Sequence, residues 1–325
     1  MPCAQGSDNW VFGDSMLAVT QRFQFLEKIG SGGEGECWLA FDKSTHKTVV
    51  CKKRRQPEPS DDSGAEEPSV RVNVVDSLIG DARRGHPAAK VQLFTSAQGS
   101  WSVCSYIEGI SLEALSSHES GSVLGLGMVL EIIYQLLLET DALHKQNVMH
   151  GDITPANLVI GFDGTVTLID FGQSARFGSR FSAWGAQGFT PPERQCEGVA
   201  CAESDAFSVG CLLYWLVTGS VPEILRNTRV VVDLIAPQAT GPLCPVKESL
   251  LDLAARLTCL EAHVRIPLAE AIRAVTAIKQ EVPLGDRESL AVLVASKAVN
   301  DRQSTTSVQS IETKPVYASL YSMKP

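Results

Sequence analysis

The sequence predicts an α+β protein in which a small antiparallel sheet precedes a larger helical region. Short apolar runs separated by turn residues occupy residues 23–108, a pattern typical of antiparallel strands. From Leu112 onward the apolar residues recur every three or four positions, which indicates amphipathic helices. The predicted helices lie at residues 123–144, 206–218, 246–257 and 268–280. We therefore expect two lobes, an N-lobe over residues 23–108 and a C-lobe over residues 109–282.

The composition is that of a globular protein, with 44% hydrophobic and 20% charged residues in a chain of 325. A net charge of -9 argues against nonspecific nucleic-acid binding, which relies on excess Lys and Arg. The nine cysteines include no C-x-x-C pair, which favours reduced thiols over a disulfide framework. The apolar segment 121–140 contains Glu131 and Gln135, so it is predicted to be a buried helix rather than a membrane span. Because the first residues do not form a signal peptide, we expect an intracellular protein without membrane insertion.

Five apolar runs make up the predicted sheet. They read FQFLEKIG, GECWLAFD, KTVVCKKR, KVQLFTS and WSVCSYIEG. The segment QPEPSDDSGAEEPS interrupts them and is predicted to be a loop, because it is rich in Pro, Ser and acidic residues. After this loop, Val70, Val74, Leu78 and Ala82 recur at helical spacing and predict a helix within the N-lobe.

A glycine-rich turn joins the first two predicted strands. Gly30, Gly32 and Gly35 form the pattern G-x-G-x-x-G, and glycines allow backbone N–H groups to approach phosphates closely. A dinucleotide-binding fold would need a helix directly after these glycines, whereas GECWLAFD predicts a strand. Most glycine-rich turns bind no ligand, so this pattern indicates phosphate binding only together with the other motifs.

The third predicted strand ends at Lys52. A lysine at such a position is commonly just a solvated strand end. After a glycine hairpin, however, a lysine on the next strand is placed to reach the α- and β-phosphates of a nucleotide. Strand alternation puts Val50 on the same face, where an adenine would lie, and Lys53 on the opposite face.

Two polar motifs follow apolar strands in the C-lobe. The run VMHGDITPANLVI is predicted to be a strand, a loop and a strand, with Asp152 and Asn157 at the mouth of the loop. The run TLIDFGQSA ends another strand at Asp170. Each could be an ordinary turn, because Asp and Asn readily cap their own backbone. Together they offer a proton acceptor and oxygen ligands for a metal, which are the groups that phosphoryl transfer uses.

The order of these motifs resembles that of the eukaryotic-type protein kinase superfamily. The glycine-rich loop, the strand lysine, H-x-D-x-x-x-x-N, D-F-G and P-P-E follow one another over residues 23–278. The resemblance implies a bilobal kinase fold with ATP in the cleft and Ser/Thr hydroxyls of proteins as acceptors. It implies that Asp152 is the catalytic base and that Lys52 binds the α- and β-phosphates of ATP. It also makes Asn157 and Asp170 the ligands of Mg²⁺.

The resemblance further implies which residues surround ATP. Cys104 takes the gatekeeper position, and the chain from Ser105 to Ile107 takes that of the hinge, whose backbone meets the adenine. The complete predicted set is Ile29, Gly30, Ser31, Gly32, Gly33, Gly35, Cys37, Val50, Lys52, Cys104, Ser105, Ile107 and Val159.

Other positions implied by the resemblance concern the framework. Glu193 of the P-P-E element is expected to pair with Arg265, and Asp205 to brace the catalytic loop; a buried ion pair of this kind anchors a lobe. The acid that pairs with the strand lysine in the family has two candidates, Asp76 and Glu67, and both could equally be solvated.

Three positions depart from the family pattern. Gly151 replaces the arginine of H-R-D, which binds an activation-loop phosphate where it occurs, so we expect this protein not to need that switch. Thr154 and Ala186 replace a Lys and a Thr that Ser/Thr kinases usually carry, and their joint loss indicates one altered contact and weakens the Ser/Thr assignment. The motif D-I-T-P-x-N is similar to the catalytic loop of herpesvirus-encoded protein kinases. Bacterial and other viral kinases are the alternative relatives.

We expect residues 1–22 to be an N-terminal extension, residues 23–282 the kinase domain and residues 283–325 a C-terminal tail. In the tail, RESLAVLVASKAVN could form a further helix, and the residues from Asp301 onward are expected to be largely disordered. Two other functions stay open: a nucleotide-binding pseudokinase that serves as an interaction module, and a small-molecule kinase with the same fold. The protein substrate does not follow from the sequence.

Overall fold

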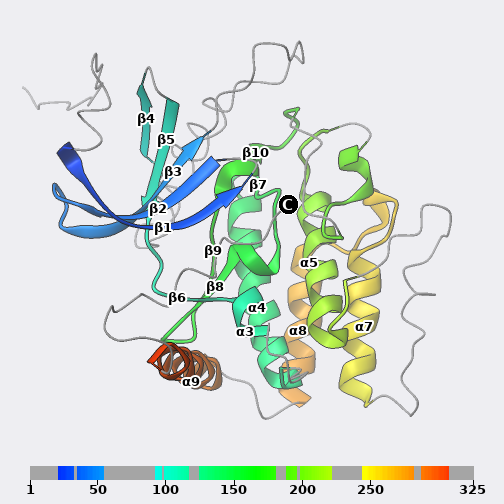
Figure 1. Cartoon of the computed structure of the whole chain (residues 1–325). Helices are drawn as coiled ribbons and strands as arrows, with labels where there is room; N and C mark the ends of the chain where they lie inside the picture. Colours follow the sequence, from blue (N-terminus) through cyan, green and yellow to red (C-terminus); the bar gives the residue numbers. More distant parts are fainter. Residues whose placement is uncertain are drawn as a thin grey trace, which may run out of the picture.

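The computed structural model has the two expected lobes, so the predicted α+β architecture is confirmed (Figure 1). The predicted loop and helix of residues 56–82 lie outside the residues that the structure describes. Those residues are 21–32, 35–54, 92–96, 99–116, 124–180, 188–195, 198–221, 244–281 and 287–306.

One antiparallel sheet forms the described part of the N-lobe, with its strands in the order β1-β2-β3-β5-β4. The strands are β1 (Phe23–Gly32), β2 (Gly35–Asp42), β3 (Lys47–Arg54), β4 (Gln92–Ser96) and β5 (Gly99–Ser105). The bounds of β2 and β3 are those predicted. The strand β5 ends four residues earlier than its apolar run, because the chain leaves the sheet there to connect the two lobes (Figure 1).

Strand alternation gives the N-lobe sheet two apolar faces. One face carries the cluster of Phe23, Ala40, Val49, Cys51 and Val103, with Phe25, Trp38 and Trp101 packed beside it. The other cluster contains Ile29, Cys37 and Leu39, with Val50 and Tyr106 against them. The second cluster contains residues predicted to meet the adenine.

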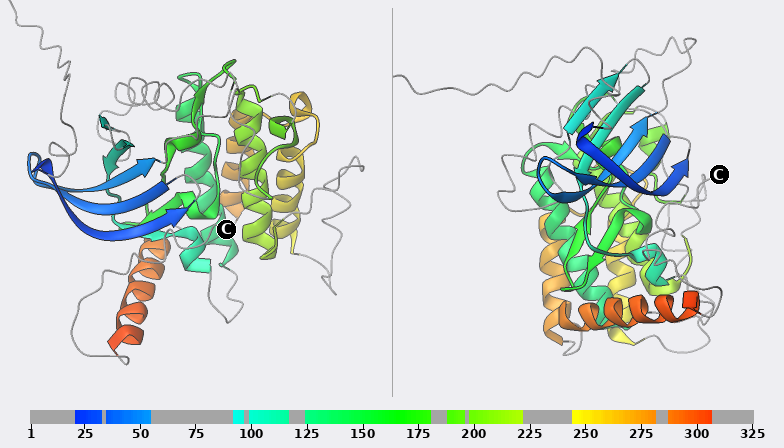
Figure 2. Two further views of the ribbon diagram at one scale, coloured as in Figure 1. Left: turned by 45° about the horizontal axis from the view of Figure 1, so that its top comes forward. Right: turned by 60° about the vertical axis from the view of Figure 1, so that its left-hand side comes forward.

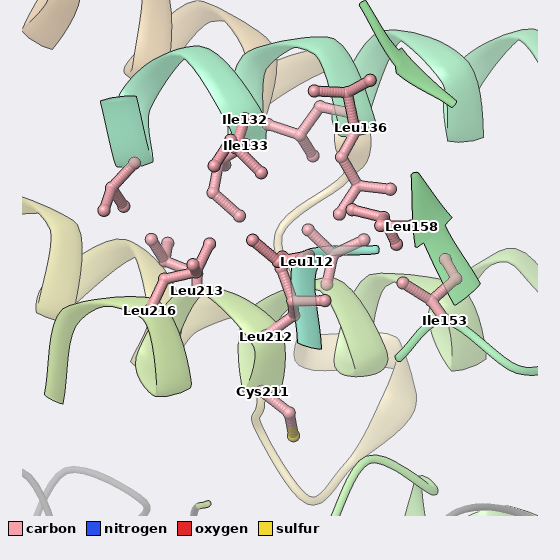
Figure 3. Close-up of a cluster of buried hydrophobic side chains, with 14 of the residues drawn as sticks. Leu112, Ile132, Ile133, Leu136, Ile153, Leu158, Cys211, Leu212, Leu213 and Leu216 are labelled. Carbon is pink, nitrogen blue, oxygen red and sulfur yellow. The ribbon is translucent and has the colours of Figure 1, made fainter. Parts of the chain in front are cut away.

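The C-lobe is built on helices that pack side by side (Figure 1). They are α3 (Leu112–Ser116), α4 (Leu126–His144), α5 (Ala202–Thr218), α7 (Pro245–Leu257) and α8 (Leu268–Glu281). All four predicted helices are present, and α5 begins four residues before its predicted start. Figure 3 shows Ile132, Ile133 and Leu136 of α4 facing Leu212, Leu213 and Leu216 of α5. These side chains belong to one large buried cluster.

Short strands form two further small sheets outside the N-lobe sheet. The strands β6 (Gly109–Ser111), β8 (Leu158–Gly161) and β9 (Val166–Leu168) form one small sheet, and β7 (Val148–Met149) pairs with β10 (Ala175–Arg176). Single 3₁₀ turns lie at Pro155–Asn157, Phe171–Gln173, Pro192–Gln195 and Ala262–Val264. The predicted order of strand, loop and strand over 148–160 is therefore confirmed.

The helix α9 (Arg287–Thr306) follows the other helices and runs across them rather than along them (Figure 2). Its residues Leu290 and Val294 are fully buried in the C-lobe core. Arg287 donates from Nε to the carbonyl oxygen of Asp163 at 2.9 Å, which ties α9 to the turn between β8 and β9. The predicted tail helix is thus present, and it extends through residues 301–306, at the start of the segment that is expected to be largely disordered.

The apolar segment that contains Glu131 is the buried helix α4, as predicted. Among the described residues, no helix is both long and apolar enough to span a membrane.

Candidate active site

The glycine-rich turn is a β-hairpin, as the sequence predicts. Gly30 lies opposite Cys37, Ser31 opposite Glu36 and Gly32 opposite Gly35, so β2 resumes directly after the turn. Gly33 lies outside the described residues. A strand on each side of the glycines excludes the strand–turn–helix arrangement of dinucleotide folds.

The predicted adenine-binding residues lie together on one face of the sheet. Ile29, Cys37 and Val50 belong to one apolar cluster, and Val50 pairs with Cys104 across β3 and β5. Burial raises the pKa of the Cys104 thiol to about 12, and the nearby Asp170 adds to this effect. The thiol therefore acts as a small apolar group at neutral pH. Val159 is buried in β8.

The predicted hinge connects β5 to β6. Ser105 is the last residue of β5, and residues 106–108 form no regular structure. Tyr106 is tied back to the sheet, because its N–H donates to the carbonyl oxygen of Thr48 at 3.4 Å. Ile107 is half-buried, and its backbone lies in the stretch that is expected to meet an adenine.

Lys52 meets Asp170 across the two lobes. The Nζ of Lys52 lies 3.0 and 3.2 Å from the two carboxylate oxygens of Asp170, although the residues are 118 positions apart. Burial alone would raise the pKa of Asp170, but the charge and hydrogen bond of Lys52 outweigh it and lower the pKa. Asp170 is therefore an anion that faces a cation at the junction of the lobes.

A left-handed backbone conformation orients Asp170. Its φ is 61°, and its side chain accepts a hydrogen bond from the N–H of Gly172 at 3.2 Å. Such a conformation is uncommon for a residue other than glycine and is frequent at functional sites. On the opposite sheet face, Lys53 lies over the ring of Trp101 at 5.8 Å, so the prediction that the two lysines point to opposite faces is confirmed.

The catalytic-loop candidates Asp152 and Asn157 are joined to each other. The amide nitrogen of Asn157 donates to Oδ2 of Asp152 at 2.7 Å and to the Asp152 carbonyl oxygen at 2.8 Å. The N–H of Ile169 donates to the Asn157 carbonyl oxygen at 2.9 Å, which brings the segment of Asp170 beside the loop. The three polar residues that the sequence separates thus lie on adjoining segments.

Packing holds the loop between these polar residues. Ile153 is fully buried, and Figure 3 shows it beside Leu158 at the edge of the core between α4 and α5. His150 is also buried: its Nδ1 accepts from the N–H of Asp152 at 3.3 Å, and its Nε2 faces the carbonyl oxygen of Ile169 at 3.2 Å. Since a carbonyl oxygen only accepts, Nε2 carries the proton.

Asp205 braces the loop from α5, as the resemblance implies. Its carboxylate accepts from the N–H groups of His150 at 2.8 Å and Gly151 at 2.9 Å. The Nε2 of His144 lies 2.8 Å from the same carboxylate. Burial alone would raise the pKa of Asp205, but His144 and the Gly151 N–H stabilise the anion, and the net effect lowers the pKa.

The expected ion pair of the P-P-E element is present. Arg265 binds both carboxylate oxygens of Glu193, at 2.6 and 2.7 Å, and Ser204 donates to the same carboxylate at 2.9 Å. Burial would raise the pKa of Glu193, but the hydrogen bond and charge of Arg265 lower it overall. This bidentate pair fixes the P-P-E element to the lobe.

Sequence reasoning did not assign a role to His144 or to Arg194. His144 ends α4 and reaches Asp205, while Arg194 follows Glu193 and donates to the carbonyl oxygen of Gly151. The helix-C candidates Asp76 and Glu67 lie outside the described residues, as does Ala186, so these expectations stay predictions. Thr154 is buried within the loop.

A lysine, two carboxylates and an amide lie on adjoining segments between the two lobes, and these are the groups that phosphoryl transfer uses, because it depends on positioning and charge rather than on reactive groups. The family can then be given. A family model of the protein kinase domain matches residues 23–274, and the chain belongs to that family.

Bacterial proteins are among the relatives. The chain is 23% identical to the serine/threonine-protein kinase PknD of Chlamydia muridarum, over 78% of this chain and 31% of that protein. It is 26% identical to the serine/threonine-protein kinase PknB of Mycolicibacterium smegmatis, over 63% of this chain and 34% of that protein. The PknB of Mycobacterium tuberculosis is 25% identical over 63% of this chain. The chain spans about a third of the length of these relatives.

Proposed function

We propose that this protein transfers the γ-phosphoryl group of ATP to Ser or Thr hydroxyls of protein substrates. The observation that carries the proposal is the pairing of Lys52 with Asp170, at 3.0 Å, beside the loop of Asp152 and Asn157. A salt bridge that only joined the two lobes would not need the polar groups of Asp152 and Asn157 beside it. A nucleotide site does, because it must place a cation and metal ligands around the same phosphates.

Asp152 is the proposed catalytic base. Its carboxylate is half-buried and is held by the Asn157 amide, so it has one fixed orientation before any substrate arrives. A base that is already oriented can accept the proton of a hydroxyl without losing side-chain entropy in the reaction. The same contact leaves the amide oxygen of Asn157 for another partner.

The residues suit a Mg²⁺ ion. Asp170 is an anion, and no hydrogen bond within the described part of the chain uses the Asn157 side-chain oxygen. Oxygen ligands of this kind, with waters and phosphates, are those that Mg²⁺ prefers. Bound there, the ion would neutralise charge on the phosphates. Lys52 would then exchange its contact with Asp170 for the α- and β-phosphates.

The purine would lie against the apolar cluster of Ile29, Cys37 and Val50, with backbone groups of residues 105–107 beside its edge. The two kinds of surface divide the work, since apolar burial supplies affinity and the hinge backbone supplies orientation. The set of ATP-contacting residues proposed from the sequence is kept unchanged, with Gly33 and Val159 included.

The Ser/Thr assignment is supported by the printed names of the bacterial relatives, which are serine/threonine-protein kinases. Their bacterial source also favours the bacterial rival over the herpesvirus resemblance. A pseudokinase is less well supported, because the four polar residues of the site are all present and paired. An intracellular location and the domain limits of 23–282 stay our predictions.

The test is incubation with labelled ATP, Mg²⁺ and a mixture of proteins, followed by phosphoamino-acid analysis. We expect label on phosphoserine or phosphothreonine and none when EDTA removes the metal. Label on phosphotyrosine alone would correct the acceptor class. Binding of ATP without transfer to any protein would contradict the proposal and favour a pseudokinase.

A further inference from the structure

Gly151 stands directly before the catalytic-base candidate, and its backbone excludes any larger residue. Its φ is +79°, a conformation that residues with a side chain rarely adopt. A Cβ built on it would lie 2.5 Å from the carbonyl oxygen of Gln173 and 3.1 Å from the methyl carbon of Met149. The position that carries arginine in the H-R-D pattern therefore cannot accept one in this protein.

A glycine at this position leaves the base with a weak local restraint. Glycine rotates more freely between its two peptide planes than any other residue. Asp152 is attached to the second of those planes, so its carboxylate moves with any rotation at Gly151. The loop needs contacts that hold both planes, and these have to come from elsewhere in the fold.

Both peptide planes are held. The first plane contains the N–H of Gly151, which donates to Oδ1 of Asp205 at 2.9 Å. The second contains the Gly151 carbonyl oxygen and the N–H of Asp152, which are parts of one rigid unit. That carbonyl oxygen accepts from Nη1 of Arg194, and the Asp152 N–H donates to His150. Arg194 thus holds the plane that carries the base at its carbonyl oxygen, while His150 holds it at its N–H.

Arg194 and Asp205 both bind Gly151, and they are also linked to each other through their neighbours in the chain. Glu193, its neighbour in the chain, is bound by Ser204, and Asp205, the neighbour of Ser204, holds Gly151. Two linked pairs of consecutive residues therefore bind Gly151, one at its N–H and the other at its carbonyl oxygen. Arg194 is only 3% exposed, so water does not compete for its hydrogen bond.

We propose that Arg194 is a positioning residue, which fixes Asp152 through the Gly151 carbonyl and replaces the arginine that Gly151 cannot carry. The proposal rests on the proposed phosphotransfer function. The contact between Arg194 and the Gly151 carbonyl oxygen joins two groups of the protein itself, so it forms when the chain folds. Phosphorylation is then not required to assemble the loop.

The test compares Arg194→Met and Arg194→Lys with the wild type and with Arg256→Met. Arg256 is a surface control, because it is half exposed and pairs with Glu270 on the outside of the C-lobe. Misplacing a catalytic group by about 1 Å can cost about 100-fold in rate. We expect kcat to fall about 10- to 100-fold in Arg194→Met and less in Arg194→Lys, with the Kd for ATP unchanged in both. Arg256→Met should keep the wild-type kcat.

Each outcome decides the matter. A folded Arg194→Met protein with wild-type kcat would overturn the proposal. Loss of ATP affinity in parallel with kcat, or unfolding of both Arg194 variants, would overturn it too, because Arg194 would then hold the fold rather than the loop. Wild-type protein treated with phosphatase should retain its kcat, and a loss would contradict the built-in brace. If the wild type itself transfers no phosphate, the proposed function fails, and this is seen before any variant is made.

Discussion

The two lobes differ in how their apolar residues are joined. In the described part of the C-lobe, one large cluster includes Ile153, Leu158 and Phe171, which belong to the segments that carry the candidate catalytic groups, and only a small second cluster lies apart from it. In the described N-lobe sheet, the apolar residues fall into two smaller clusters on opposite faces. The base and the metal ligands are therefore fixed by a large core, whereas Lys52 depends on the charges that face it.

Among the substitutions that compare the two lobes, the largest effect is expected from removing the charge that the N-lobe contributes. Lys52→Met should lower the rate of phosphoryl transfer about 10²- to 10³-fold, the usual loss when one electrostatic stabiliser of a transition state is removed. Lys53→Met is the matched control, since Lys53 lies over Trp101 on the other face of the sheet. Initial rates with labelled ATP measure both variants. Equal losses in the two would show that the strand, rather than the position of the charge, matters.

The two cores should respond differently to the same truncation. Leu212→Ala, in the centre of the large cluster, should lower the free energy of unfolding by about 2–5 kcal/mol. Leu39→Ala should cost about 2 kcal/mol, at the lower end, because a small cluster can collapse around the cavity. Urea unfolding measures both losses. A larger loss for Leu39→Ala would contradict the contrast between the lobes.

The C-lobe should also lose stability in acid. The pKa of Asp205 is lowered in the folded protein, so its stabilisation is fully present above the unfolded value of about 3.9 and is lost as the pH falls through the folded value. The free energy of unfolding should therefore decrease below about pH 4. In Asp205→Asn protein this dependence should be weaker, and the protein less stable at neutral pH. An identical slope in both proteins would refute the assignment.

The smallest effect concerns two thiols of the N-lobe sheet, Cys104 opposite Val50 of the adenine face and Cys51 in the cluster on the other face. Burial raises the pKa of both Cys104 and Cys51 to about 12, so little reactive thiolate forms at neutral pH. Iodoacetamide should modify the exposed Cys244 well before either of them, as peptide mass mapping would show. A bound nucleotide should leave the rate at Cys244 unchanged. Modification of Cys104 first would mean that this face is open to solvent.

Much of the N-lobe follows from the sequence, because alternation and turn residues determine strands locally. The bounds of β2 and β3 were predicted to the residue. The helix α5 begins four residues before its predicted start, in a stretch where Ser204 and Asp205 are polar but buried and therefore do not follow the apolar pattern. They are buried because they bind Glu193 and the catalytic loop, which are distant in the sequence.

The acid, amide and lysine of the site could be predicted because their spacing and order are family motifs. Arg194 could not, because its partner is a backbone carbonyl oxygen, which leaves no mark on the sequence. The signal that was available is Gly151. Because the arginine of H-R-D is absent, another arginine could be sought near the catalytic loop. Arg194 directly follows Glu193 of the P-P-E element, whose position the family resemblance gives.

The measurement that tests the central claim most directly is phosphoryl transfer by Asp152→Asn protein. The variant should fold, bind ATP with unchanged affinity and show almost no transfer, while Asp252→Asn, at an exposed acid of α7, should transfer at the wild-type rate. Folded Asp152→Asn protein that still phosphorylates its substrates at the wild-type rate would contradict the assignment of Asp152 as the base.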